Sequence, residues 1–243
     1  MTASFQSIMD RALLRKGGEK ALQALLEDIP QTHAFEEIPD DRVLSMMCRV
    51  INQAGFNWSV ITKKWPQFEE AYFGFDVDKL VQLSPDEWEA YVKDKRVVRN
   101  WQKIKAVWEN ARFVSHISEE HGSFARFMAS YGADQQIDLM AYLKKHGSRL
   151  GGNTGMFLLR FLGKDSFILS RDVIWAIRDA GVDIAENPTS KRDLTAIQAT
   201  FNQWHKETGL SYTYLSRIAS YSIGTDNSAN KIQSELKKLG LDA

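Results

Sequence analysis

Residues 143–173, LKKHGSRLGGNTGMFLLRFLGKDSFILSRDV, contain two apolar helical patterns joined by a short turn at residues 150–154. The turn carries the adjacent glycines Gly151 and Gly152 and has neither proline nor an acidic residue. Adjacent glycines are typical of turns that need positive φ or the close approach of another backbone. From Thr154 onward the pattern predicts the first turn of a helix, where backbone N–H groups lack intrahelical partners and point outward. The stretch therefore predicts an anion-binding turn.

Basic residues flank this turn, and no acidic residue lies between the first and the last of them: Lys144, Lys145, Arg149 and Arg160. This arrangement favours a polyanion over a single carboxylate. A purely structural alternative is a tight corner in which the first glycine only ends a helix. The stretch resembles the helix-hairpin-helix of the DNA glycosylase superfamily, which grips the phosphates of one DNA strand through backbone amides. We expect this motif over residues 137–180.

The composition is that of a soluble globular protein with a substantial core: 243 residues, 44% hydrophobic and 26% charged. Lysine plus arginine equals aspartate plus glutamate at 31 each, which argues against a nonspecific nucleic-acid coat but allows a local basic face. The single cysteine, Cys48, excludes an internal disulfide. Since there is neither a signal sequence nor an apolar run of about 18 to 20 residues, we expect a cytoplasmic protein without a membrane segment.

Helical periodicity dominates the sequence, so we predict an all-α fold. Helices are expected at residues 4–28 with a break at Gly17–Gly18, and at 42–54, 79–83, 113–121, 123–131, 137–145, 173–180, 191–208 and 212–223. Ser84 and Glu87 form a predicted capping box. The aromatic residues Phe68, Tyr72, Phe73 and Phe75 are predicted to pack in the core. Residues 224–243 form a polar tail with a short helix expected near 231–239.

Residues 92–112 carry seven lysines or arginines against only Asp94 and Glu109. Such a run is most often a solvated helix face. The functional alternative is a helix that faces phosphates. The sequence alone leaves both interpretations open.

Several separated motifs occur in a fixed order between residues 53 and 111. They are QAGFNW at 53–58, Lys63-Lys64, the aromatics Phe68, Phe73 and Phe75, VVRNWQKI at 97–104 and Asn110-Ala111. Together they resemble the 3-methyladenine DNA glycosylase type I family over residues 38–175. The resemblance implies one two-lobed helical glycosylase domain spanning residues 1–243, with residues 150–155 on DNA and a base pocket between the lobes. It also implies that residues 212–223 pack against residues 4–54.

The resemblance gives Trp58 the role of stacking on a flipped base, with Gln53 and Asn57 beside it at the same corner. The family's base-recognising glutamate lies eight residues before that tryptophan, where this chain has Val50. Valine neither accepts a hydrogen bond nor balances a cation. The family's zinc-binding histidine corresponds to Asp172, and there is no second cysteine, so we predict neither zinc nor another cofactor.

The chemistry that remains is hydrolysis of a weakened glycosidic bond. An N3-alkylated adenine is already cationic, so its release needs only base flipping, binding of the leaving group and access for water. A carboxylate could activate that water. In the superfamily an aspartate follows the hairpin, at a place that falls on Ser170 here. Asp172 is therefore the first catalytic candidate and Asp165 the second, although the more usual role of an aspartate at this place is a helix N-cap.

We therefore predict a DNA repair glycosylase that removes alkylated purines such as 3-methyladenine from double-stranded DNA. It would be monofunctional, because no lysine stands at a recognisable Schiff-base position in the hairpin. Phosphates would be held by the side chains of Lys144, Lys145 and Arg149 and by the backbone amides of Gly151, Gly152 and Thr154. The alternative is a descendant of the fold that binds DNA without cutting the glycosidic bond. No obligatory protein partner is expected.

Overall fold

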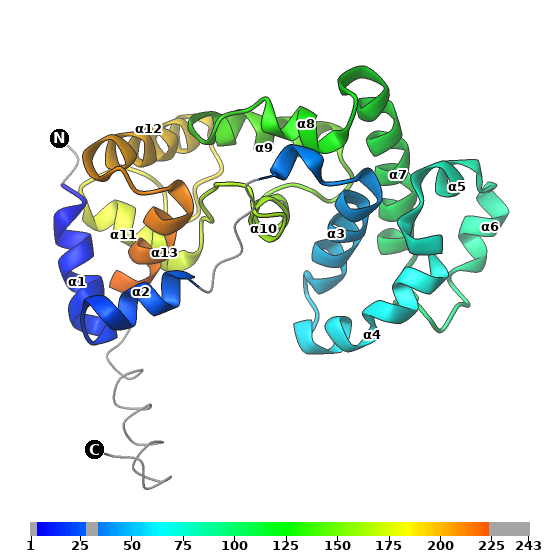
Figure 1. Ribbon diagram of the computed structural model, residues 1–243, viewed down its shortest axis with the longest axis horizontal. Coiled ribbons are helices and arrows are strands. Elements are labelled where there is room, and N and C mark those ends of the chain that lie inside the picture. The colour runs from blue at the N-terminus through cyan, green and yellow to red at the C-terminus, as the bar shows by residue number, and fades with distance from the viewer. Residues whose placement is uncertain (1–3, 28–33, 224–243) are drawn as a thin grey trace, which may run out of the picture. The chain divides into compact units, whose positions relative to one another are not determined.

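The computed structural model describes residues 4–27 and 34–223, and every regular element within these ranges is a helix (Figure 1). The predicted all-α class is confirmed. No helix in the described ranges is long and apolar enough to cross a membrane. The predicted helix near residues 231–239, with the rest of the tail at 224–243, lies outside the described residues.

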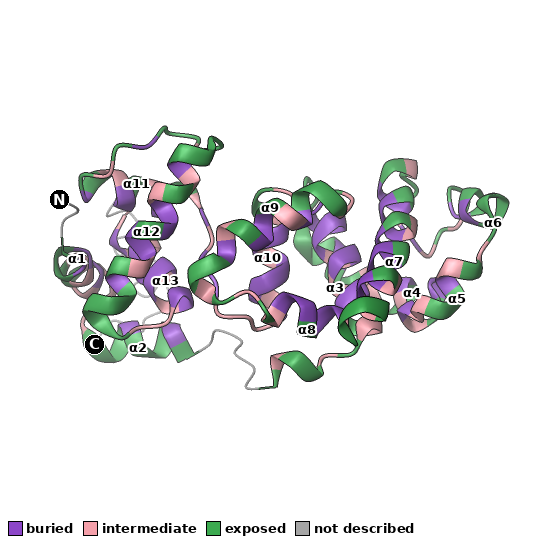
Figure 2. Cartoon of the chain, turned by 90° about the horizontal axis from the view of Figure 1, so that it is seen from above, coloured by how far each residue is buried: buried purple, intermediate pink, exposed green. Residues whose placement is uncertain are grey.

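The chain divides into two compact units, one formed by Gln31–Asp165 and the other by Met1–Pro30 together with Ser166–Ala243. Buried residues gather on the inner faces of the helices within each unit (Figure 2). The predicted hairpin stretch at 137–180 therefore contains two helices of the first unit and one of the second.

The unit formed by Gln31–Asp165 holds the middle of the chain and is called the central unit below. It is built around α7 (Trp101–His121), which packs against α3 (Asp40–Gln53), α5 (Val77–Gln82), α6 (Pro85–Ala90) and α8 (Phe124–Ala129). The remaining elements of this unit are α4 (Trp58–Ala71), α9 (Gln136–His146), α10 (Asn153–Phe161) and the short 3-10 turns η1 (Phe35–Glu37), η2 (Phe73–Phe75) and η3 (Ala133–Gln135).

Side-chain caps set where several of these helices begin. The predicted capping box forms at α6, where Ser84 and Glu87 exchange side-chain and backbone hydrogen bonds. Asn57 caps α4 by accepting a hydrogen bond from the backbone N–H of Ser59. Asn100 caps α7 in the same way. Each cap satisfies an N–H group that the first helical turn leaves unpaired.

An aromatic cluster fills the space beside α7, and three of its four predicted members are buried. Phe68, Tyr72 and Phe75 are each at most 1% exposed. The prediction is wrong for Phe73, which is 49% exposed. Phe73 follows the end of α4 and has a φ of 55°, in the left-handed region. The helical periodicity that predicts a core position therefore no longer applies to it.

The other unit consists of α1 (Gln6–Lys16), α2 (Glu19–Glu27), α11 (Arg171–Asp179), α12 (Lys191–Thr208) and α13 (Tyr212–Ser222). The break between α1 and α2 falls at the predicted glycines, Gly17 having a φ of 86°. α13 packs against α1 and α11. The expected return of residues 212–223 to the start of the chain thus holds for α1, whereas α3 belongs to the central unit.

Candidate functional site

A pocket of about 380 Å³ opens at the corner between α3 and α4. It is lined by Val50, Gln53, Ala54, Gly55, Phe56, Trp58, Asn153, Thr154 and Phe157, all from the central unit. The structure therefore brings together three of the four residues predicted to bind a base with Thr154 of the glycine-rich turn. The fourth, Asn57, does not line the pocket and instead holds the first turn of α4 in place.

Trp58 is fixed in orientation but accessible. Its indole lies 5.2 Å from the ring of Phe157 and 5.8 Å from that of Phe161, with interplanar angles of 85° and 79°. Perpendicular ring pairs of this kind are attractive and set the relative ring orientation. Because 44% of Trp58 remains exposed, the side chain is a wall of the pocket and not a core residue.

Gln53 places a buried polar group in the wall of this pocket. The residue is 5% exposed, and its Oε1 has no hydrogen-bond partner in the part of the chain that the structure describes. A buried acceptor left unpaired is unfavourable by roughly 1–3 kcal/mol. Val50, one turn earlier on α3, is 4% exposed and adds only apolar surface. The lining on this side of the pocket is therefore uncharged.

Lys103 is a buried cation next to this corner, and the sequence analysis missed its role. Its Nζ donates hydrogen bonds to the backbone oxygens of Asn52, at 2.9 Å, and Ala54, at 3.0 Å. It thereby caps the C-terminal end of α3, where carbonyl groups lack intrahelical donors. Burial and, second, the charge of Arg149 lower the pKa of Lys103. One sequence signal could have indicated its burial: Lys103 stands four residues before the apolar Val107, and this spacing places Lys103 on the inner face of α7.

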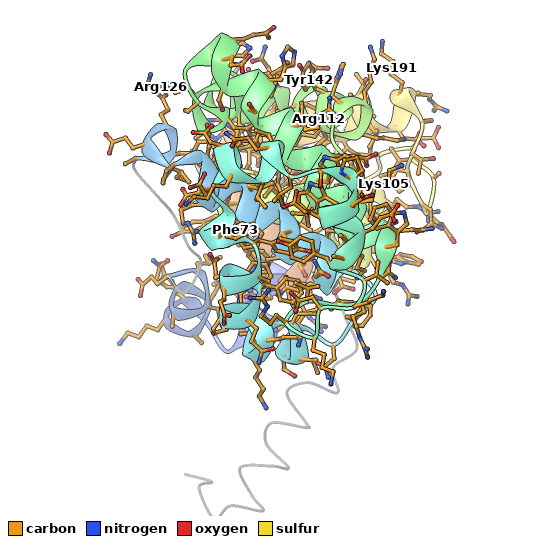
Figure 3. The ribbon with its side chains drawn as sticks, turned by 90° about the vertical axis from the view of Figure 1, so that its right-hand side faces the viewer. Phe73, Lys105, Arg112, Arg126, Tyr142 and Lys191 are labelled. Atoms are coloured by element: carbon orange, nitrogen blue, oxygen red, sulfur yellow. The ribbon has the colours of Figure 1, made fainter. Side chains whose placement is uncertain are left out.

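The other charges in the basic run at 92–112 are partly engaged. The guanidinium of Arg96 pairs with the carboxylates of Asp94 and Glu70, and Lys105 lies 3.5 Å from Glu109. Only the part from Trp101 onward is helical. Lys105 and Arg112 stand on the exposed face of α7 (Figure 3).

The glycine-rich turn connects α9 to α10 and uses two residues with positive φ, Arg149 at 59° and Gly152 at 57°. It is fastened to α7 through Asn110, whose Nδ2 donates to the backbone oxygen of Ser148 and whose Oδ1 accepts from the Ser148 N–H. Both distances are at most 3.0 Å. The side chains of Lys144, Lys145 and Arg149 are exposed around it. The predicted set of basic residues and turn amides is therefore gathered at one place.

Gly155 allows α10 to lie against this turn, because a β-carbon there would stand 2.4 Å from the Leu150 backbone oxygen and 2.7 Å from Met140 Cε. We expect Gly155→Ala to lower the free energy of unfolding by about 1–2 kcal/mol, since backbone has to move to relieve the overlap. Urea denaturation measures the change. Gly151→Ala is the matched control, because its β-carbon would meet only the flexible Lys144 side chain, at 3.1 Å. Equal losses in both variants would contradict this packing argument.

The carboxylate candidates lie elsewhere. Asp172 belongs to the first turn of α11, in the unit that contains Ser166–Ala243. The alternative that Asp172 caps the helix is wrong, because Ser170 is the N-cap and its Oγ accepts from the Val173 N–H at 3.3 Å. Asp165 lies in the central unit and lines a different pocket, beside Lys164. Among residues 4–27 and 34–223, no group of three or more histidine, cysteine, aspartate or glutamate side chains could hold a metal ion.

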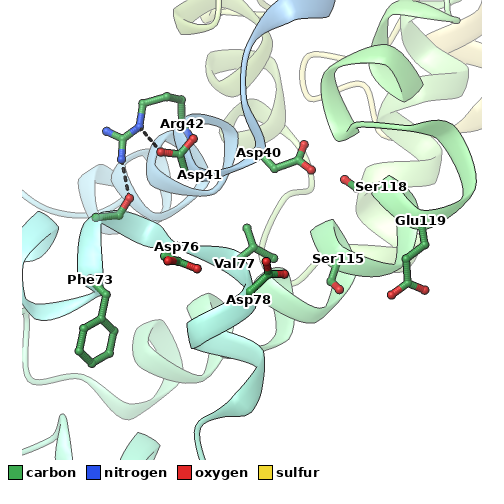
Figure 4. A pocket seen from close by; sticks show the side chains of 11 residues that line it. Asp40, Asp41, Arg42, Phe73, Asp76, Val77, Asp78, Ser115, Ser118 and Glu119 are labelled. Carbon is green, nitrogen blue, oxygen red and sulfur yellow. Dashed lines mark hydrogen bonds and ion pairs between the residues drawn. The ribbon is translucent and has the colours of Figure 1, made fainter.

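A larger pocket, of about 790 Å³, has the opposite character (Figure 4). Its lining includes five acidic residues: Asp40, Asp41, Asp76, Asp78 and Glu119. Its one basic side chain, Arg42, already pairs with Asp41 and with Glu69. This concentration of carboxylates repels phosphate. The smaller pocket at Trp58, next to the basic turn, is therefore the candidate site for a nucleic-acid ligand.

Comparison with known proteins points to the same part of the chain. Residues 33–150 match the family model of methyladenine glycosylase. Over 95 residues the sequence is 26% identical to DNA-3-methyladenine glycosylase 1 of Escherichia coli (strain K12). This alignment covers 39% of this chain and 51% of that protein. The DNA-3-methyladenine glycosylase of Haemophilus influenzae is 23% identical, with the same coverage. The chain thus spans about half the length of the curated relatives it matches.

The fold extends further than the sequence match. The crystal structure of the Methanocaldococcus jannaschii 8-oxoguanine DNA glycosylase aligns with 89% of this chain and 93% of its own, with a TM-score of 0.56 at 14% identity. That likeness shows a shared helical architecture. The sequence match contains the α3–α4 side of the pocket, together with Lys103 and Asn110. The α10 side of the pocket, formed by Asn153, Thr154 and Phe157, lies beyond it.

Proposed function

Because the chain belongs to the methyladenine glycosylase family, matched over residues 33–150, we propose that it is a DNA glycosylase acting on alkylated purines such as 3-methyladenine. It would flip the damaged nucleotide out of double-stranded DNA and hydrolyse the bond between base and sugar. The observation that carries this proposal is the pocket at Trp58, whose α3–α4 side lies inside the matched segment and whose other side follows the basic turn.

In this proposal Trp58 stacks on the flipped base. Its exposed indole is held by Phe157 and Phe161, so the side chain loses little conformational entropy when a base stacks on it. Stacking on an aromatic side chain contributes about 1–3 kcal/mol per base, and a cationic base adds a cation–π attraction of roughly 0.5–2 kcal/mol. Val50 and Gln53 form the neighbouring wall, and Asn57 keeps the start of α4 in register.

The turn between α9 and α10 would bind the DNA backbone. Phosphate oxygens would accept from the backbone N–H groups of Gly151, Gly152 and Thr154, at the N-terminal end of α10. The exposed cations Lys144, Lys145 and Arg149 would neutralise neighbouring phosphates. Since Asn110 fastens this turn to α7, the amides would be ordered before DNA arrives.

For hydrolysis, the oxygen of a water molecule would bond to the sugar C1′ while the bond to the base breaks. The bonding electron pair would leave with the base and neutralise its positive charge, and the water would give up one proton to the activating carboxylate. We assign activation of this water to Asp172, with Asp165 as the second candidate. Asp172→Asn and Asp165→Asn, assayed side by side for base release, separate the two: the variant that loses release identifies the carboxylate.

We place the enzyme in the cytoplasm, where the buried thiol of Cys48 would remain reduced.

The direct test is release of free bases from methylated duplex DNA by the purified protein, with chromatographic identification of each product. Release of a methylated purine supports the proposal. The second candidate function, DNA binding without excision, is favoured by Val50, which leaves the pocket without a carboxylate. Duplex binding with no released base at any protein concentration would establish that alternative and exclude the glycosylase.

Reversing two charges beside the turn, in the double variant Lys144→Glu and Lys145→Glu, should lower duplex affinity by roughly tenfold and reduce the salt dependence of binding by about two counterions. The reason is that each lysine releases about one condensed counterion when it meets a phosphate. Fluorescence anisotropy with labelled duplex at several salt concentrations measures both quantities.

The matched control is Lys191→Glu with Lys206→Glu, which changes net charge equally at exposed positions of α12. If both double variants lose the same affinity, only overall charge matters and the turn is not the DNA-binding element.

A further inference from the structure

The pocket at Trp58 has polar side chains on both of its sides. α3 contributes the amide of Gln53, whereas α10 contributes the amide of Asn153 and the hydroxyl of Thr154. Gln53 is 5% exposed and its Oε1 is buried, so this acceptor does not reach an occupant of the pocket. Asn153 is exposed and Thr154 is half-buried. The amide and hydroxyl groups with the most accessible surface therefore stand on the α10 side.

The α3 side offers an occupant little further hydrogen bonding. Val50 contributes only apolar surface to the lining. The backbone oxygen of Ala54 already accepts a hydrogen bond from Lys103 Nζ, at 3.0 Å. Trp58, at the start of α4, is the proposed stacking surface and would contact a base through its ring face. A base stacked on Trp58 would therefore meet most of its side-chain hydrogen-bond partners on α10.

Asn153 is available as such a partner. It is the first residue of α10, and no hydrogen bond occupies its side chain within residues 4–27 and 34–223. The N-cap of the helix is Gly152, so the Asn153 amide is not needed to hold the first turn. Groups that stand on a regular helix are placed more precisely than groups on a loop. The amide is therefore both unoccupied and well placed at the pocket.

The chemistry of an amide side chain matches one purine better than the other. An asparagine presents an acceptor oxygen beside a donor nitrogen. The edge of adenine that carries N6 and N7 presents a donor beside an acceptor, so both hydrogen bonds form at once. Guanine presents two acceptors, O6 and N7, on the same edge, and only one bond is then possible. Alkylation at N3 leaves this edge of adenine unchanged.

Resting on the proposed function, we propose that Asn153 determines the specificity of this pocket, its Oδ1 accepting from the N6 amino group of the flipped base and its Nδ2 donating to N7. The pocket would thereby select alkylated adenine over alkylated guanine. Because the pairing does not depend on the charge of the base, it adds to the cation–π attraction of Trp58. Asn153 lies beyond residues 33–150, so the residue that reads the base edge stands outside the segment that matches the family.

Free bases test this pairing without DNA and without catalysis. We would use calorimetry, at a mildly alkaline pH where these bases are uncharged, to measure the Kd of 3-methyladenine, 3-methylguanine and 3-methyl-7-deazaadenine, which lacks the N7 acceptor. Wild-type protein should bind 3-methyladenine at least about threefold more tightly than the deaza analogue, because one hydrogen bond is lost. The preference over 3-methylguanine should be about 5- to 150-fold. Equal binding of 3-methyladenine and its deaza analogue would overturn the inference.

Two substitutions of Asn153 test whether this residue carries the preference. Asn153→Leu removes both hydrogen-bonding groups, so it should bind 3-methyladenine no better than the deaza analogue. Asn153→Asp keeps an acceptor for N6 but turns a second oxygen toward N7, so it should bind the deaza analogue more tightly. A carboxylate is well tolerated in the first turn of a helix, which protects this second variant from misfolding. A wild-type preference that persists in either folded variant would overturn the inference.

Thr154→Val is the matched control in the same helical turn. It removes the hydroxyl but keeps the backbone N–H that is proposed to bind phosphate. A hydroxyl can donate or accept and so pairs with either kind of base edge. Its loss should therefore change the affinities for 3-methyladenine and its deaza analogue by the same factor. Loss of the preference in Thr154→Val, with the preference retained in Asn153→Leu, would assign the specificity to the wrong residue.

These measurements separate the inference from the proposed function. Release of 3-methyladenine from methylated DNA, combined with an unaltered preference in the Asn153 variants, would overturn only the role of Asn153. Failure of all three bases to bind wild-type protein would overturn the assignment of this pocket as a base site. The expected preferences without any release from DNA would support the role of Asn153 and leave the noncatalytic alternative as the function of the protein.

Discussion

Replacing Trp58 with alanine should lower the rate of base release from alkylated DNA by about 5- to 150-fold, the range expected when one base loses its stacking partner. Duplex affinity should stay within about twofold, because the proposed phosphate contacts come from the turn between α9 and α10. Single-turnover release with excess protein, together with anisotropy on undamaged duplex, measures the two effects separately.

Trp175→Ala provides a matched control. Trp175 is 45% exposed, against 44% for Trp58, but it lies on α11 and does not line the pocket. Its loss should leave base release unchanged. If both tryptophan variants slow release to the same extent, or if Trp58→Ala loses duplex affinity in parallel with rate, the stacking role is wrong.

Lys103→Met should destabilise the protein by about 2–4 kcal/mol, because methionine keeps most of the apolar stem but leaves the backbone oxygens of Asn52 and Ala54 without their shared donor. The end of α3 forms one wall of the pocket, so free-base affinity should fall as well. Urea denaturation followed by circular dichroism gives the free energy of unfolding.

The control here is Lys105→Met on the same helix, where the lysine side chain is 51% exposed and pairs only with Glu109 at 3.5 Å. An exposed pair of this kind contributes between 0 and about 1 kcal/mol. A difference of less than about 0.5 kcal/mol between the two variants would show that the buried cap at α3 contributes little to stability.

Sequence reasoning was most accurate where a local signal decides the outcome. The bounds of α12 agree with the predicted 191–208, because Ser190 caps its first turn and Gly209 ends it with a φ of 71°. The capping box at Ser84 is equally local. The family resemblance, expected over residues 38–175, is confirmed as far as residue 150 by a match over 33–150, and the part at 151–175 stays a prediction.

Prediction from the sequence failed where contacts between distant parts of the chain decide whether a residue is buried. Phe73 has the composition of a core residue, but the chain turns at its positive φ and exposes it. Lys103 was one of seven basic residues in a run, and only the packing of α7 against α3 shows that it is buried. Similarly, nothing local indicates that Asn110 fastens a turn 38 residues further along the chain.

Lys103 and Asn110 lie seven residues apart on one face of the same uninterrupted helix, α7. Two helical turns, about 10 Å, therefore separate the contact that holds the end of α3 beside the Trp58 pocket from the contact that holds the turn between α9 and α10. Because α7 is uninterrupted, it fixes the distance between these two contacts. Lengthening α7 by a single residue between these positions would rotate one contact by about 100° relative to the other. The hydrogen bonds of Lys103 to α3 and of Asn110 to Ser148 could then no longer form together.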